Sequence, residues 1–197
     1  TNINPLVLKQ MNDRLYHRGP DGEGYCFSNG VLTFGDLPGL IDFRPESDIN
    51  FGFAHRRLSI VDLSTAGHQP MTLRERYVIT YNGEVYNHPE LRVELEALGY
   101  SFYSHTDTEV ILAAYDAWGT ECLKRFNGMW AFVIVDTAKS RVFISRDRFG
   151  IKPFYFYRTE STYVFASEIK AILAHPDINT EPDLGYCLNY LENGATE

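Results

Sequence analysis

Two neutral hydrogen-bond donors stand side by side in the tetrapeptide Tyr81-Asn82-Gly83-Glu84. The side-chain amide of Asn82 and the backbone N–H of Gly83 are donor types that stabilise negative charge developing on a carbonyl oxygen, as in an oxyanion hole. A glycine at this point also allows a substrate to approach the backbone closely. The flanking residues predict a β-strand that ends at this amide and glycine and then resumes as a short extended segment. The tetrapeptide therefore predicts a site that polarises a carbonyl group.

Charged residues in other segments could bind the two ends of a free α-amino acid. An arginine can hold a carboxylate through two parallel hydrogen bonds, and Arg56 and Arg57 are both candidates. A carboxylate such as Asp107 or Glu84 could receive an α-ammonium group. Together with Asn82, these residue types predict a pocket for an amino acid whose side-chain carbonyl is activated.

Helices and strands come in blocks along the chain. Helices are expected at residues 5–16, 88–98, 108–118 and 168–173, strands at 24–27, 31–34, 51–58, 77–81, 130–135, 141–145, 154–157 and 163–166, and a tail from 184–191. Because the strands form hairpins and do not alternate singly with helices, the pattern favours an α+β fold over a doubly wound parallel sheet. The longest stretch without a pattern is residues 59–71, and loops of that length are often functional.

The composition is that of a globular protein and argues against several functions. The chain has 197 residues, enough for one domain with a sizeable core, and its formal net charge of −8 argues against nucleic-acid binding. No apolar run is long enough to span a membrane. The three cysteines are far apart, which favours a reduced, cytoplasmic setting. The six histidines show no pair with ligand spacing on one helix, so no metal is expected.

The polar clusters, taken together and in order, resemble the class II glutamine amidotransferase domain, and in detail the glutaminase half of asparagine synthetase. The matching segments are residues 17–24, 55–71, 81–87, 107–112, 126–132, 146–153 and 165–170, which cover nearly the whole chain. The resemblance implies the four-layer α-β-β-α sandwich of the N-terminal-nucleophile hydrolases, built from antiparallel sheets. It also implies an enzyme that hydrolyses L-glutamine to glutamate and ammonia.

The resemblance implies a role for each candidate site residue. The segment lining the glutamine site would be Arg57, Leu58, Ser59, Ile60 and Val61. Arg57, as distinct from Arg56, would bind the α-carboxylate. Asp107 would hold the α-ammonium group with help from Glu84, whose alternative role is to hold its own loop. Asn82, through its side chain, and Gly83, through its backbone, would form the oxyanion hole.

In this family the nucleophile is a cysteine at position one of the mature chain, on a strand before the first helix, with its own α-amine as the base. This sequence begins Thr1-Asn2-Ile3-Asn4-Pro5 and runs directly into the first expected helix. We expect a short segment with the cysteine to precede Thr1. The alternatives are that Thr1 is itself the nucleophile, or that the domain is a catalytically silent structural module, as in β-lactam synthetase. Cys26, Cys122 and Cys187 lie on elements unsuited to replace the nucleophile.

The resemblance also implies a larger protein. Residues 1–180 would be the glutaminase domain without its first strand, and 181–197 a tail or linker toward a C-terminal synthetase domain. That domain would use ATP and Mg²⁺ to convert aspartate to asparagine, whereas the glutaminase domain needs no cofactor. An amidotransferase serving another acceptor is an alternative, but the runs at 58–62 and 148–153 favour the synthetase branch. Expected partners are L-glutamine, the synthetase domain and a second copy in a homodimer, with neither nucleic acid nor membrane.

Overall fold

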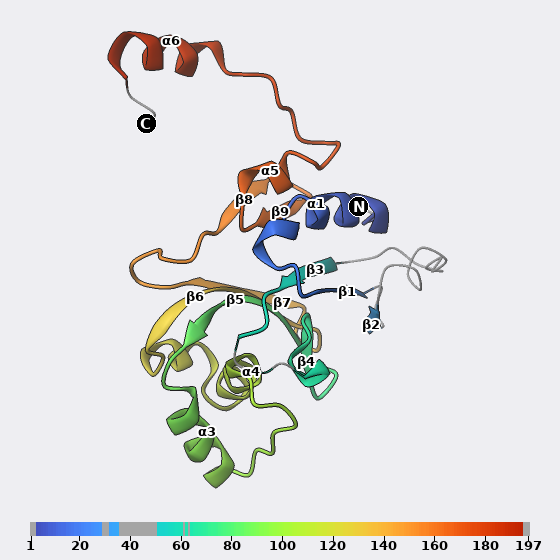
Figure 1. Cartoon of the computed structure of the whole chain (residues 1–197), viewed down its shortest axis with the longest axis vertical. Coiled ribbons are helices and arrows are strands. Elements are labelled where there is room, and N and C mark those ends of the chain that lie inside the picture. Colours follow the sequence, from blue (N-terminus) through green and yellow to red (C-terminus); the bar gives the residue numbers. More distant parts are fainter. Residues whose placement is uncertain (1–2, 29–31, 36–50, 61, 63, 195–197) are drawn as a thin grey trace.

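The computed structural model describes residues 3–28, 32–35, 51–60, 62 and 64–194 (Figure 1). The helices and strands have the bounds α1 Pro5–Asp13, β1 Gly22–Ser28, β2 Leu32–Gly35, β3 Phe51–Arg57, β4 Met71–Leu73, β5 Tyr77–Val85, α3 His88–Ala97, α4 Asp107–Trp118, β6 Gly128–Asp136, β7 Arg141–Arg146, β8 Tyr155–Arg158, β9 Tyr163–Ala166, α5 Ile169–Ile172 and α6 Leu184–Asn193. Short 3-10 helices lie at Tyr16–Arg18, Thr65–Gly67 and Gly119–Lys124.

The strands form two antiparallel sheets and a separate hairpin. One sheet has the order β4-β5-β6-β7 and the other β2-β1-β3, while β8 pairs with β9. β5 pairs with β6 along its whole length, from Tyr77 to Val85. In contrast, β4 pairs with β5 only from Tyr77 to Ile79. Beyond Ile79, no described strand covers the outer edge of β5.

Successive side chains of a strand point to opposite faces of its sheet, and this alternation builds the layers. On one face of the four-stranded sheet, Ile79 and Tyr81 pack with the buried side chains of α3 and α4. On the other face, Val78 and Val133 pack against Phe53 of the three-stranded sheet. The two sheets therefore lie face to face, with α3 and α4 outside one of them (Figure 1).

The hairpin β8–β9 shares a layer with the three-stranded sheet. Phe165 of β9 packs in the core between the sheets, whereas its neighbour Val164 packs with Met11 of α1 and Ile172 of α5. α1 and α5 consequently form the fourth layer (Figure 1). This order confirms the four-layer α-β-β-α sandwich expected from the sequence.

The expected elements are present, with differences at their ends. The strand expected at 77–81 does not stop before Asn82, because its ladder with β6 continues through residues 82–85. The first helix ends at Asp13 and is followed by a 3-10 turn. The tail at 184–191 is the helix α6, which lies apart from the four layers (Figure 1) and has no buried residue. Residues 29–31, which connect the strands expected at 24–27 and 31–34, lie outside the described residues. The domain boundary at 180 stays a prediction.

Candidate active site

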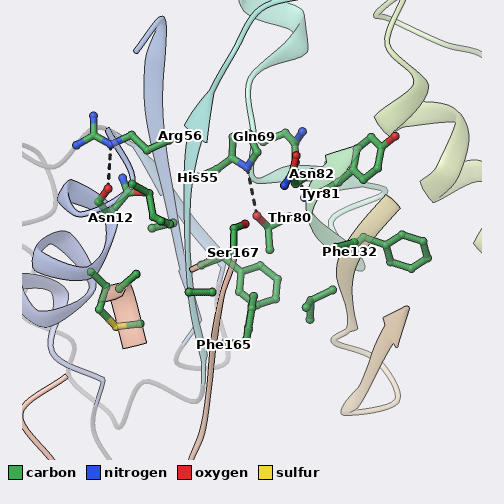
Figure 2. Close-up of a pocket in the computed structure, with 18 of the residues that line it drawn as sticks. Asn12, His55, Arg56, Gln69, Thr80, Tyr81, Asn82, Phe132, Phe165 and Ser167 are labelled. Atoms are coloured by element: carbon green, nitrogen blue, oxygen red, sulfur yellow. Dashed lines mark hydrogen bonds between the residues drawn. The ribbon is translucent and has the colours of Figure 1, made fainter. Parts of the chain in front are cut away.

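A cavity of about 740 Å³ lies between the sheet layers and brings the expected site residues together (Figure 2). Those that line it are Arg57, Leu58, Ser59, Ile60, Asn82, Gly83, Glu84 and Asp107. The remaining one, Val61, lies outside the described residues. A cavity of this size with a few convergent polar groups has the character of a small-molecule site.

The uncovered edge of β5 has side-chain acceptors at two of its amides. The Tyr81 N–H donates to Oε1 of Gln69 at 2.7 Å, and the Val85 N–H donates to Oδ2 of Asp107 at 2.9 Å. Because alternate residues of a strand direct their backbone groups to the same side, the Gly83 N–H leaves the same edge between these two. No described side chain or loop carbonyl accepts a hydrogen bond from it.

The pairing with β6 agrees with this direction of the Gly83 amide. Trp130, the partner of Gly83 in the ladder, directs its own backbone to the other side. Its carbonyl accepts a hydrogen bond from the Asp147 N–H at 2.8 Å, and its N–H donates to the Asp147 carboxylate at 3.3 Å. Gly83 and Trp130 are therefore a non-hydrogen-bonded pair, and the Gly83 N–H remains directed away from β6.

Asn82 provides the second donor of the expected pair. Its side chain projects from the face of β5 opposite to that of Tyr81, because neighbouring residues alternate. Figure 2 shows Asn82 beside Tyr81 and Gln69 at the cavity. Among the described residues, no hydrogen-bond partner of the Asn82 amide is found. Two adjacent donors without an acceptor among the described residues have the composition of an oxyanion hole, and that role stays a prediction.

Asp107 is held at the N-terminus of α4. The helix is capped by Thr106, whose hydroxyl accepts a hydrogen bond from the Glu109 N–H at 3.3 Å. The residue Asp107 is 5% exposed, and its Oδ2 also accepts a hydrogen bond from the Tyr81 hydroxyl at 2.7 Å. Burial and the nearby Asp107 raise the pKa of Tyr81 well above its ordinary value, so the hydroxyl stays a donor. Oδ1 receives no hydrogen bond from the described residues, and its role toward an α-ammonium group stays a prediction.

The two adjacent arginines of β3 have different surroundings, because their side chains leave opposite faces of the strand. Arg56 forms ion pairs with Asp13 at 2.6 Å and Glu23 at 2.9 Å, and its Nε donates to the Asn12 carbonyl (Figure 2). This arginine ties α1 to β3. Its charge is therefore already compensated by two carboxylates.

Arg57 faces the loop that follows β3. Its Nη1 donates to the Ser64 carbonyl at 2.8 Å, and its Nη2 donates to the Asp62 carbonyl. A guanidinium has five N–H donors, so these two bonds leave others for an anion. A Cβ added to Gly67 would come 2.3 Å from Nη2, which shows how closely the loop covers the guanidinium. No described carboxylate pairs with Arg57, but its role toward a substrate carboxylate stays a prediction.

The remaining expected residues form the entrance side of the cavity. Leu58 and Ile60 are 55% and 68% exposed, and the Ser59 N–H donates to Oδ2 of Asp21 at 2.8 Å. Glu84 lines the cavity, and its carboxylate forms no hydrogen bond or ion pair with the described residues. No contact among the described residues therefore supports the interpretation that Glu84 holds its own loop. Contact between Glu84 and a substrate stays a prediction.

Two residues of the site were not identified from the sequence. Gln69 and His55 both line the cavity, and the Nδ1 of His55 lies 3.4 Å from the Thr80 hydroxyl (Figure 2). Burial, and to a lesser degree the charges of Arg57 and His68, lower the pKa of His55 to about 4. In the sequence, only the position of Gln69 near the end of the unpatterned stretch 59–71 indicated a functional role.

None of the three cysteines has the character of a nucleophile at the cavity. Burial raises the pKa of the Cys26 and Cys122 thiols to about 12, which makes them poor nucleophiles. Cys187 is exposed on α6 and does not line the cavity.

Within the described part of the chain, no group of three His, Cys, Asp or Glu side chains is arranged to hold a metal ion. No helix among the described residues has the length and apolarity needed to cross a membrane.

Comparisons with known proteins identify the family to which this site belongs. The family model described as glutamine amidotransferase domain matches residues 42–197. The chain is 39% identical over 180 residues to asparagine synthetase (glutamine-hydrolyzing) 3 of Bacillus subtilis, covering 90% of this chain and 26% of that protein. It is 39% identical over 179 residues to asparagine synthetase (glutamine-hydrolyzing) 1 of the same organism, covering 90% of this chain and 25% of that protein. The chain therefore belongs to the glutamine amidotransferase domain family and spans about a quarter of the length of these two relatives.

A solved structure shows the same fold. Glutamine phosphoribosylpyrophosphate (PRPP) amidotransferase from B. subtilis, complexed with ADP and GMP, superimposes with a TM-score of 0.70 over 86% of this chain and 40% of that chain. The sequence identity is 22%, so the likeness concerns the fold alone. It supports the layered sandwich described above.

The close packing around Gly83 gives a prediction for Gly83→Ala. An added Cβ would lie 2.3 Å from the Met129 carbonyl oxygen, 2.6 Å from the Tyr81 ring and 2.8 Å from the Trp130 Cα. Overpacking of this kind costs about 1–3 kcal/mol, and we expect that loss of stability in urea unfolding. Gly22→Ala is the control, because its nearest neighbour would be 3.9 Å away. Equal stability of the two variants would contradict the packing argument.

The low pKa of His55 predicts a pH dependence of stability. The native imidazole stays neutral down to about pH 4, whereas the unfolded one takes up a proton below its ordinary pKa. The unfolded state therefore binds more protons between these values, and stability falls as the pH falls through this window. We expect the free energy of unfolding, measured in urea, to fall between about pH 7 and pH 5. This fall should be about 1–2 kcal/mol smaller in His55→Gln than in the unmodified protein.

The exposed Asn193, which does not titrate, provides the control for this measurement. The variant Asn193→Ala should keep the pH dependence of the unmodified protein. If His55→Gln keeps it as well, the burial of His55 is not the source of that dependence.

Proposed function

We propose that this domain hydrolyses L-glutamine to glutamate and ammonia, and that a second domain of the whole protein uses the ammonia with ATP and Mg²⁺ to convert aspartate to asparagine. The observation that carries the proposal is the uncovered Gly83 N–H beside the Asn82 amide, in a cavity that also contains Asp107. The second domain is supported by the names of the two relatives and by the quarter of their length that this chain spans.

The substrate would lie with its side-chain carbonyl oxygen on Asn82 and Gly83. Oδ1 of Asp107 receives the α-ammonium group, and the remaining N–H donors of Arg57 bind the α-carboxylate. Glu84 adds a second negative charge near the α-ammonium. The site would be specific for an amino acid because it offers a cation to the α-carboxylate and carboxylates to the α-ammonium group.

The nucleophile would be a cysteine on a segment that precedes Thr1. Its thiolate attacks the carbonyl carbon of the glutamine side chain, and the C–N bond breaks as the proton from the thiol passes through the α-amine to the leaving ammonia. Water then hydrolyses the thioester to glutamate and regenerates the thiol. Asn82 and Gly83 stabilise the oxyanion of both tetrahedral intermediates.

The shape of the cavity supports this arrangement. β3 and β9 are edge strands of their sheets, and residues of both line the cavity. Edge strands present N–H and C=O groups that can pair with a further strand. Ile3 and Asn4, at the start of α1, also line the cavity, so a segment before them could enter between the two strands. Its first residue would then lie within reach of Asn82.

The activity is tested on the full-length protein by measuring glutamate and ammonia released from L-glutamine. Asn82→Ala should lower kcat about a hundredfold or more, because one oxyanion donor is lost. Asn193→Ala, at an exposed position of α6, should leave kcat unchanged. An unaltered kcat in Asn82→Ala would remove Asn82 from the oxyanion hole. An unmodified protein that releases no ammonia would instead favour the silent structural module.

The role of Asp107 is tested with Asp107→Asn, which removes the charge but keeps an oxygen for the Tyr81 and Val85 donors. The KM for glutamine should rise about 10- to 100-fold, as expected for loss of a hydrogen bond between charged groups. Tyr81→Phe, which leaves the carboxylate charged, should raise the KM much less. If Asp107→Asn lowers kcat at an unchanged KM, Asp107 supports β5 and does not bind the ammonium group.

A further inference from the structure

Gln69 continues the pairing of β4 with β5 by means of its side chain. Met71 is the first residue of β4 and stands opposite Ile79, so the same register places Gln69 opposite Tyr81. There the acceptor of the Tyr81 N–H is Oε1 of the Gln69 side chain, at 2.7 Å. Pro70, between Gln69 and β4, has no N–H to donate to a ladder.

Because a side chain and not a further strand residue pairs with Tyr81, the next amide on this edge of β5, that of Gly83, remains uncovered. If β4 continued in register, backbone would lie against β5 as far as Gly83 and cover its amide. A single side-chain oxygen satisfies the Tyr81 amide and reaches no further. Asp107 does the same from the other direction at Val85. The Gly83 N–H is thus fixed between two held amides and still faces the cavity.

Gln69 is itself held from both sides of the molecule. Its Nε2 donates to the Thr108 hydroxyl at 3.4 Å, on the residue that follows Asp107 in α4. Its backbone carbonyl lies against β1, where a Cβ added to Gly24 would come within 2.2 Å of the oxygen. Figure 2 shows the Gln69 side chain at the cavity beside Asn82 and Tyr81. The amide group can therefore define the position of the β5 edge.

We propose that Gln69 is a positioning residue for the oxyanion hole. It acts through the Tyr81 amide, sets the direction of the Gly83 N–H and does not contact the substrate. The proposal rests on the proposed glutamine hydrolysis and adds a residue to it. An error of about 1 Å in the position of a catalytic donor can lower a rate by orders of magnitude.

The test compares two variants of the full-length protein. Gln69→Leu has a similar volume and no acceptor, and it should lower kcat for glutamine hydrolysis about tenfold with little change in KM. Gln69→Glu keeps an oxygen for the Tyr81 N–H but loses the Nε2 donor, and it should retain most of the kcat. Gln10→Leu, on the exposed side of α1, is the matched control and should behave as the unmodified protein. If Gln69→Leu does not fold, Gln69→Met serves as the variant without an acceptor.

A second measurement does not depend on activity. Hydrogen exchange of the Tyr81 amide should be at least about tenfold faster in Gln69→Leu than in the unmodified protein or in Gln69→Glu, because the amide loses its acceptor. An unchanged exchange rate would overturn the proposal. A raised KM at unchanged kcat would also overturn it, since Gln69 would then contact the substrate. The unmodified protein could be inactive while exchange of the Tyr81 amide is still faster in Gln69→Leu. That result would refute the proposed hydrolysis and would leave the hydrogen bond from the Tyr81 amide to Gln69 in place.

Discussion

Where β4 stops pairing with β5, at Ile79, the following amides on that edge need other acceptors, because a buried N–H without a partner is costly. Side chains from distant segments supply two of them, Gln69 at Tyr81 and Asp107 at Val85. For the Gly83 amide between them, no side chain or loop carbonyl among the described residues is an acceptor. The candidate site is thus a gap in a sheet edge whose borders are fixed by hydrogen bonds.

The position of this edge between the two sheets explains the rest of the cavity. One face of β5 carries Tyr81 into the core with α4, which brings the N-terminus of that helix and Asp107 to the edge. The other face lies toward β3, so the Thr80 hydroxyl and the His55 ring come within 3.4 Å of each other between the layers (Figure 2). The same alternation divides the arginines of β3, with Arg56 ion-paired to Asp13 and Glu23. Arg57 is left for the loop and the cavity.

The comparisons and the geometry support each other at different levels. Family membership rests on a matched model and on relatives with 39% identity, and the layered fold is shared with an amidotransferase of only 22% identity. Neither comparison says which atoms face the cavity. That information comes from the uncovered edge of β5, from the carboxylate on α4 and from the edge strands β3 and β9.

The sequence by itself determined the α+β class, most elements and several residues that line the cavity, because strand and helix periodicity, caps and adjacent donors are local properties of the chain. From the residues alone it did not distinguish Arg56 from Arg57, and the family resemblance made that assignment. It ended β5 too early, since the continuation through Gly83 depends on pairing with β6, more than 40 residues further along the chain. Tertiary structure alone decided the hydrogen bonds of Gln69 and of the Tyr81 hydroxyl. Which side chain meets a strand edge is set by packing between distant segments, and no local pattern records it.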